Sequence, residues 1–344
     1  MPSLISRREA LRRTVVFSAA ALVGRRGMVF AAPPETAFGG GGIDILAMGD
    51  FGTKGDENQT AVANAMAKFA KSLGHSPAAV LALGDNFYGK LTPDRFENHF
   101  EKLYSPEYLN CPFYACLGNH DYGVGKYDLQ PEKLGMQMDY AKDHPESRWK
   151  LPSKWYSVEL PSPENPLVKI LVLDGNFSEG YLKPQEKIEQ RRWLKAELKK
   201  PTAAPWLWLV NHFPFFSDCE NRGDNKGLIR EWGPLLKEHN VSLCLAGHDH
   251  TMQHLRVEGY PTSFIVNGAG GAKLYNLKPT DRGFTENKHR GFNHIHVTPD
   301  ELNVQFITAD GECLHHFTRN RAGEEKVLTT ADVTPSFGGV PSVA

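Results

Sequence analysis

Five short apolar segments of this 344-residue chain each end at a residue that can bind a metal ion. Residues 43–49 precede Asp50, and residues 81–84 precede Asp85. The other three segments run into the polar groups Asn119-His120-Asp121, Asn211-His212 and His248-Asp249-His250. Short apolar runs of this kind predict buried strands. In open α/β sheets, ligands collect beyond the carboxyl ends of the strands. The sequence therefore predicts that these distant side chains meet at one site.

The order of the predicted elements indicates the fold class. Apolar runs at 43–48, 79–83 and 113–117 alternate with residues 58–73 and 93–103, which have helical character. Such alternation predicts a largely parallel sheet covered by helices. Further helices are predicted at 184–200 and 228–238, and further strands at 155–160, 168–174, 206–210, 241–246, 263–266, 294–297, 302–308 and 314–318. We expect an α/β fold of four layers, in which two stacked mixed sheets are flanked by helices.

The folded domain is predicted to span residues 43–320. Residues 1–32 resemble a bacterial twin-arginine export signal, because arginine pairs precede an apolar run at 14–23 and small residues follow it. A Sec signal or an N-terminal anchor is the alternative. We expect export through the twin-arginine machinery to the periplasm or the medium. Residues 33–42 are predicted to be a flexible linker, residues 321–344 a loosely ordered tail, and residues 122–149 an irregular lid or binding loop.

Charge and composition exclude several classes of protein. The formal net charge is -1, which is unlike the basic footprint of a nucleic-acid binder. The body of the chain has no apolar stretch of about 18 residues or more, so no membrane span is expected once the signal is removed. The five cysteines form no CxxC pair, and their odd number leaves at least one of them unpaired. We predict no specific disulfide.

The side chains at the predicted strand ends form a ligand set of oxygen and nitrogen atoms without a thiolate. They are Asp50, Asp85, Tyr88, Asn119, His212, His248 and His250. This chemistry favours iron, manganese or zinc over a cysteine-rich structural zinc site. Seven ligands are too many for one zinc ion, but they suit two ions about 3.5–4 Å apart with a bridging carboxylate. Glycines precede four of the five segment ends, and we expect them to supply unusual backbone angles and close approach. They are Gly49, Gly84, Gly118 and Gly247.

Taken together, these motifs resemble the five blocks of the calcineurin-like metallophosphoesterases. The blocks are Gly49-Asp50-x-Gly52, Gly84-Asp85-Asn86-Phe87-Tyr88, Gly118-Asn119-His120-Asp121, Asn211-His212 and Gly247-His248-x-His250. Tyr88, three residues after Asp85, makes the chain similar to the purple acid phosphatases, and the small tartrate-resistant type is the closest match. Residues 137–156 with their Arg148-Trp149, residues 192–194 and residues 266–271 also resemble that type.

The resemblance implies a role for each residue of the site. Asp50, Tyr88 and His250 would hold Fe(III). Asn119, His212 and His248 would hold a divalent ion, either iron, zinc or manganese, and Asp85 would bridge the two. His120 would face the substrate as the catalytic residue, and we expect Asp121 to orient it. The implied reaction is hydrolysis of phosphate monoesters by a metal-bound hydroxide, on a small molecule or a phosphoprotein.

Two other functions fit the same residues. One is a phosphodiesterase or nucleotide pyrophosphatase using the same two metals, and the other is an exported binding protein without turnover. The small-type enzymes also carry a second substrate-facing histidine, which residues 213–230 lack. Asn221, Arg222 and residues 122–144 are the candidates to replace it. We interpret four further histidines and one aspartate as structural: His294, His296, His315, His316 and Asp174.

Overall fold

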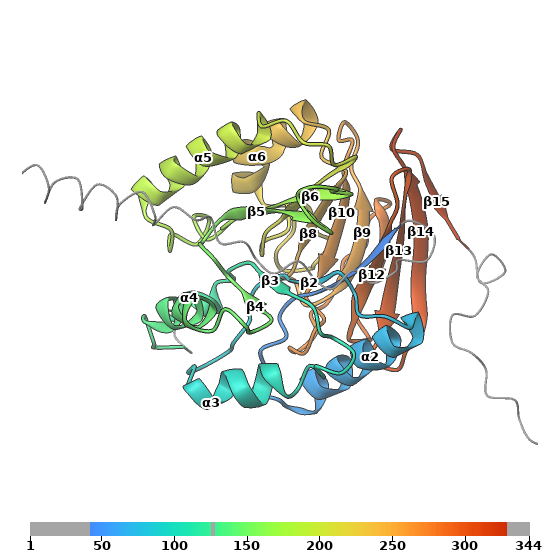
Figure 1. The fold of residues 1–344 in the computed structure, drawn as a ribbon. Coiled ribbons are helices and arrows are strands. Elements are labelled where there is room, and N and C mark those ends of the chain that lie inside the picture. The colour runs from blue at the N-terminus through green and yellow to red at the C-terminus, as the bar shows by residue number, and fades with distance from the viewer. Residues whose placement is uncertain (1–41, 125–127, 329–344) are drawn as a thin grey trace, which may run out of the picture. The chain divides into compact units, whose positions relative to one another are not determined.

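Two β-sheets pack face to face in this computed structural model, and helices cover their outer faces (Figure 1). The structure describes residues 42–124 and 128–328. The first sheet has eight strands in the order β15-β14-β13-β12-β1-β2-β3-β4. The second has seven strands in the order β11-β9-β10-β8-β7-β6-β5. This arrangement confirms the predicted four-layer α/β fold.

The strands of the first sheet are β1 (Ile43–Met48), β2 (Ala79–Ala82), β3 (Phe113–Ala115), β4 (Trp149–Lys150), β12 (Gly291–Val297), β13 (Glu301–Thr308), β14 (Cys313–Asn320) and β15 (Glu325–Val327). Those of the second sheet are β5 (Tyr156–Leu160), β6 (Val168–Val172), β7 (Trp206–Val210), β8 (Leu243–Ala246), β9 (Met252–Arg256), β10 (Ser263–Asn267) and β11 (Gly283–Glu286). Strands β1 to β4 run parallel to one another, as do β6, β7, β8 and β10. The remaining pairs are antiparallel.

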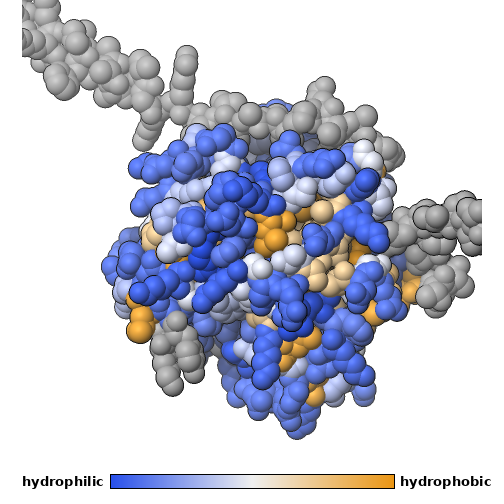
Figure 2. Space-filling view, turned by 90° about the horizontal axis from the view of Figure 1, so that it is seen from below, coloured by the Kyte–Doolittle hydropathy of each residue, from blue (hydrophilic) through white to orange (hydrophobic). Residues whose placement is uncertain are grey.

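Helices α2 (Glu57–Leu73) and α3 (Pro93–Phe96) lie on the outer side of the first sheet (Figure 1). Helix α2 begins where the Asp56 side chain accepts a hydrogen bond from the Gln59 amide, and it ends at Gly74 in a left-handed conformation. It buries Val62, Met66 and Phe69, which recur at helical spacing. Figure 2 views this side of the molecule and shows mostly hydrophilic side chains with small, separate apolar patches.

Helices α5 (Pro184–Leu198) and α6 (Lys226–Glu238) cover the second sheet (Figure 1). The alternation of side chains along β7 shows how the layers form. Trp208 and Val210 belong to the core shared with the first sheet, whereas Leu209 packs with Leu194 of α5 and Trp232 of α6. Successive side chains of a strand point to opposite faces, so β7 is buried on both sides. This explains why it is an unbroken apolar run.

Several elements differ from the sequence-based prediction. Residues 122–149, expected to be irregular, contain helix α4 (Lys133–Asp143), and β4 begins at Trp149. The tail expected from residue 321 forms strand β15, which pairs with β14. Short strands β9 and β11 also escaped prediction. The predicted export signal, almost all of the linker and the end of the tail lie outside the described residues. Across residues 42–124 and 128–328, no helix is both long and apolar enough to cross a membrane.

Candidate metal centre

The predicted ligands come from both sheets. Asp50, Asp85 and Asn119 follow β1, β2 and β3 of the first sheet. His212 follows β7 of the second sheet, and the segment with His248 and His250 follows β8. These strands are parallel within each sheet, so their carboxyl ends lie at one edge. The site therefore forms where the corresponding edges of two packed sheets meet, rather than along neighbouring strands of a single sheet.

Asp50, Tyr88 and His250 form one group of side chains. The Tyr88 hydroxyl donates to Asp50 Oδ1 at 3.1 Å and lies 3.2 Å from His250 Nε2. His250 Nε2 is 3.2 Å from the same oxygen of Asp50. Three possible ligand atoms thus face one another at nearly equal distances, and all three side chains are predicted ligands of the ferric ion.

Asn119, His212 and His248 form a second group. Asn119 Oδ1 lies 3.2 Å from His212 Nε2 and 3.0 Å from His248 Nδ1. The two ring nitrogens are 3.2 Å apart. This group contains the three side chains that the resemblance assigns to the divalent ion.

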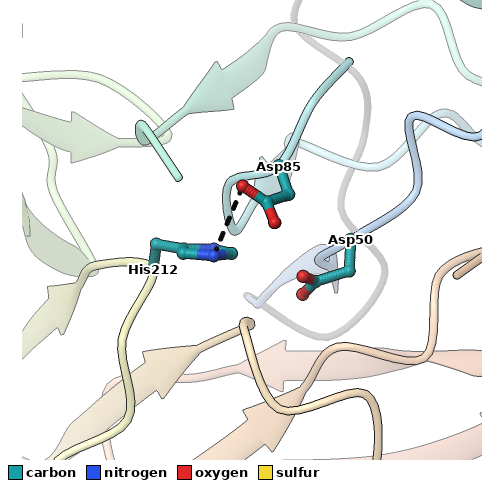
Figure 3. Close-up of side chains that lie close together, drawn as sticks. All are labelled: Asp50, Asp85 and His212. Atoms are coloured by element: carbon teal, nitrogen blue, oxygen red, sulfur yellow. Dashed lines mark ion pairs between the residues drawn. The ribbon is translucent and has the colours of Figure 1, made fainter. Parts of the chain in front are cut away.

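Asp85 connects the two groups. Its Oδ1 lies 3.5 Å from His212 Nε2, and ligand atoms of Asp50, Asp85 and His212 all lie within 4.8 Å of one another. The three side chains point toward a common space (Figure 3). A carboxylate placed between two groups of ligands is able to bridge two metal ions.

The backbone at the ligands differs in one respect from the prediction. Among the four glycines, only Gly84 has a positive φ, whereas the ligand residues themselves adopt the left-handed conformation, with φ of 57° at Asp50, 51° at Asp85 and 67° at His248. Gly118 and Gly247 instead serve close approach. A Cβ on Gly247 would lie 2.5 Å from Asp50 Oδ2, and a Cβ on Gly118 would lie 2.2 Å from Asp85 Oδ1. Non-glycine residues with positive φ, such as Asp50, Asp85 and His248, are common at functional sites.

The hydrogen bonds around the histidines fit a metal centre. His212 Nδ1 lies 2.8 Å from the Leu83 carbonyl, and His250 Nδ1 lies 2.7 Å from the Lys273 carbonyl. A carbonyl only accepts, so each Nδ1 carries the hydrogen. In the neutral ring, Nε2 then presents a lone pair to other acceptors, namely oxygens of Asp85, Asn119 and Asp50. Lone pairs that face one another repel unless a cation lies between them. A metal-binding histidine usually donates a hydrogen bond from its other ring nitrogen to a carbonyl, as these two rings do.

The charges of the site also favour a bound cation. Burial lowers the pKa of His212, but the carboxylates of Asp85 and Asp50 outweigh it and raise this pKa to about 9. Burial, followed by the charge of Asp50, raises the pKa of the Tyr88 phenol. The buried carboxylates thus attract positive charge, which a proton on His212 supplies when no metal does. A bound metal ion would take the place of that proton and would stabilise the Tyr88 phenolate.

His120 lies beside the two groups, but Asp121 does not orient it as predicted. The His120 backbone amide donates to Asp85 Oδ1 at 2.9 Å, and its ring lies 4.6 Å from the Tyr88 ring. Its Nδ1 lies 2.7 Å from Asp128 Oδ2. Asp121 is buried elsewhere and accepts from the amides of Asn86 and Gly118, so it ties two ligand loops together. The sequence reasoning missed Asp128, which lies in the segment predicted to be a loop.

Two further residues reach the centre. Arg222 contacts His248 Nε2, lies 3.3 Å from Asp249 Oδ1, and donates to the Tyr275 hydroxyl at 3.3 Å. The Tyr275 ring stacks on His250 with 4.0 Å between ring centroids. Arg222 was one of the candidates to replace the missing histidine, whereas Tyr275 carried no sequence signal. A guanidinium at this rim can bind phosphate oxygens in pairs.

The residues set aside as structural have partners away from the centre. Asp174 accepts from the Tyr122 hydroxyl at 2.6 Å. His294 and His296 both lie against Asp44, at 2.7 and 2.9 Å. All five cysteines are free.

Comparison with known proteins agrees with the geometry. The family described as calcineurin-like phosphoesterase matches residues 43–252. Tartrate-resistant acid phosphatase type 5 of Sus scrofa is 31% identical over 303 residues, which cover 79% of this chain and 85% of the relative. Purple acid phosphatase 17 of Arabidopsis thaliana is 29% identical over 312 residues, covering 83% and 87%. The solved purple acid phosphatase from yellow lupin seeds superposes with a TM-score of 0.64 at 17% identity, covering 86% of this chain and 56% of that one.

The relatives and the clustered ligands lead to the same assignment. The lupin structure supports the fold alone because its sequence identity is low. The family match and the porcine relative are similarities of sequence, so they also support membership of the family. The chain belongs to the calcineurin-like phosphoesterases and, among them, to the purple acid phosphatases, as a metal-dependent phosphoester hydrolase.

Proposed function

We propose that the centre hydrolyses phosphate monoesters as an acid phosphatase, with Fe(III) held by Asp50, Tyr88 and His250. Asn119, His212 and His248 would hold the divalent ion, which would be iron, zinc or manganese, and Asp85 would bridge the two ions. The observation that carries the proposal is the pairing of the two groups through Asp85, with a phenol in one group only. A phenolate is a hard anionic oxygen ligand, which suits a ferric ion.

The chain's own residues divide the remaining work. When bound, the two cations offset the charge of the phosphate and lower the pKa of water. His120 is held at the edge of the centre because its backbone amide donates a hydrogen bond to Asp85. Its side chain faces the substrate. It donates a proton to the leaving oxygen. Arg222 binds phosphate oxygens from its position beside His248 and Tyr275. No nucleophilic side chain is required.

The test combines composition, colour and substrate preference on the purified protein. We expect iron plus one divalent metal, a visible absorption band, and a higher kcat/KM for p-nitrophenyl phosphate than for bis(p-nitrophenyl) phosphate. Preference for the diester would favour the phosphodiesterase function. A metal-loaded protein that is inert on both esters would favour the binding protein without turnover.

We further propose that the protein is exported through the twin-arginine pathway to the periplasm or the medium. Arg7-Arg8 before a short apolar run supports this proposal. Replacing both arginines by lysine is expected to trap the protein in the cytoplasm. Undiminished export of that variant would contradict the pathway.

A further inference from the structure

A buried carboxylate links His120 to a buried lysine. Asp128 Oδ2 lies 2.7 Å from His120 Nδ1, and Asp128 Oδ1 lies 2.9 Å from Lys133 Nζ. The side chain of Lys133 is 0% exposed and that of Asp128 is 1% exposed, whereas that of His120 is 26% exposed. The network therefore runs from the interior to the edge of the metal centre. Neither Asp128 nor Lys133 belongs to the motifs that identify the family.

The hydrogen bonds define how the His120 ring is held. Asp128 Oδ1 accepts from the Gly89 amide at 2.9 Å and from Lys133, so Oδ2 is the oxygen that faces His120. An ionised carboxylate only accepts, so His120 Nδ1 is the donor. Nε2 is then the ring nitrogen left to meet the substrate. A carboxylate behind a catalytic histidine is a common means of selecting its tautomer and orientation.

Lys133 prevents this carboxylate from turning away. Its Nζ donates to the carbonyls of Phe87 and Gly89, at 2.8 Å each, as well as to Asp128. These carbonyls flank Tyr88. The buried lysine has three acceptors, one of which is the Asp128 carboxylate, so its hydrogen bonds are made and its charge is compensated. The same pair thus anchors the loop of a predicted iron ligand and the ring of the catalytic histidine.

We propose that Asp128 is the positioning residue of His120: it holds Nδ1 as a donor and directs Nε2 to the oxygen that leaves the phosphate. This inference rests on the proposed monoester hydrolysis. Asp128 takes the role that was predicted for Asp121, and Lys133 immobilises the Asp128 carboxylate.

The decisive variant is Asp128→Asn. Asparagine offers one acceptor oxygen, which the donors Gly89 N and Lys133 Nζ would occupy, so its amide NH₂ would face His120 Nδ1. In that contact the asparagine would be the donor and His120 Nδ1 the acceptor, which reverses the hydrogen bond of the parent protein. We expect kcat for phenyl phosphate to fall about 10²–10⁴-fold, the usual size of a general-acid contribution. The loss should be smaller for 2,4-dinitrophenyl phosphate, whose leaving group needs no proton. Metal content and the visible spectrum should not change.

A double-mutant cycle separates positioning from general damage. The variant carrying both His120→Ala and Asp128→Asn is expected to be no slower than His120→Ala alone, because residues that act as one unit are not additive. Asp128→Glu should recover part of the activity. Asp139→Asn, an acidic residue on the exposed face of α4, is the matched control and should be unchanged. Losses that add, or equal losses for both esters, would overturn the proposal.

Two further measurements cover the case in which Asp128→Asn fails to fold because Lys133 loses its partner. The pair Asp128→Asn with Lys133→Gln removes both charges and should restore folding but not kcat. Recovery of kcat would mean that Asp128 serves only to neutralise Lys133. Nitrogen NMR of the zinc-loaded parent, assigned with His120→Ala, should show a proton on Nδ1 of His120, and a bare Nδ1 would overturn the proposal. A parent inactive on every ester would instead contradict the proposed function.

Discussion

Replacing Gly118 by alanine tests how tightly the ligand loops are packed. A Cβ at this position would lie 2.2 Å from Asp85 Oδ1 and 2.3 Å from the Asp85 amide nitrogen. The first distance is about 1.2 Å short of the 3.4 Å at which ordinary contact begins. The nitrogen belongs to backbone, so rotating the Asp85 side chain cannot relieve the clash. One of the two loops must move by about 1 Å.

The expected cost follows from that displacement. Asp85 Oδ1 lies 3.5 Å from His212 Nε2 and also accepts a hydrogen bond from the His120 backbone amide, so both sides of the centre shift together. A misplacement of about 1 Å costs about 10²-fold in rate. We therefore expect Gly118→Ala to lose at least about 100-fold in kcat/KM for p-nitrophenyl phosphate, together with part of its bound metal.

Gly135→Ala is the matched control. Gly135 lies inside helix α4, and a Cβ there would meet no atom within 4 Å. Alanine in a helix interior is favoured over glycine by about 0.5–1 kcal/mol, so this variant should melt at a slightly higher temperature with unchanged activity. Steady-state kinetics, metal analysis and thermal unfolding of both variants decide the matter. A Gly118→Ala protein with full activity and full metal content would refute the packing argument.

Four other changes test separate parts of the structure. Tyr88→Phe should abolish the visible colour, and retained colour would reject Tyr88 as a ligand. His120→Ala should keep both metals by elemental analysis but slow turnover about 10²–10⁴-fold; loss of metal would make His120 a ligand instead. Arg222→Ala should raise KM for p-nitrophenyl phosphate more than it lowers kcat, and an unchanged KM would remove Arg222 from phosphate binding. Burial alone would raise the pKa of Glu325, but His254 and the other partners of this carboxylate lower that pKa from 4.5 to about 2. The ionised form of Glu325 therefore stabilises the fold above about pH 4.5, and this stability is lost as the pH falls toward 2. Urea unfolding of the metal-free protein should show that Glu325→Gln costs on the order of 3 kcal/mol at pH 7 and weakens this acid dependence; equal pH profiles for parent and variant would contradict it.

The side chains that meet at the candidate centre could be predicted from the sequence because their signal is local. An apolar run followed at once by Asp50, Asp85 or His248 places a candidate ligand at a strand end, whatever lies on either side. The helical spacing in residues 58–73 is equally local, and α2 follows it closely. By contrast, α4 (Lys133–Asp143) lies in a segment rich in turn-forming residues, which concealed it.

Only the tertiary structure decided how these pieces meet. The sequence did not show that β1, β2 and β3 belong to one sheet and β7 and β8 to the other, because strand pairing depends on contacts between distant residues. Nor did it show which carboxylate serves His120. Asp121 is adjacent in sequence, but neighbours on the short 3₁₀ turn at His120–Tyr122 project in different directions. Asp128 reaches the ring because the Gly89 amide and Lys133 Nζ hold its carboxylate beside the loop that carries Tyr88.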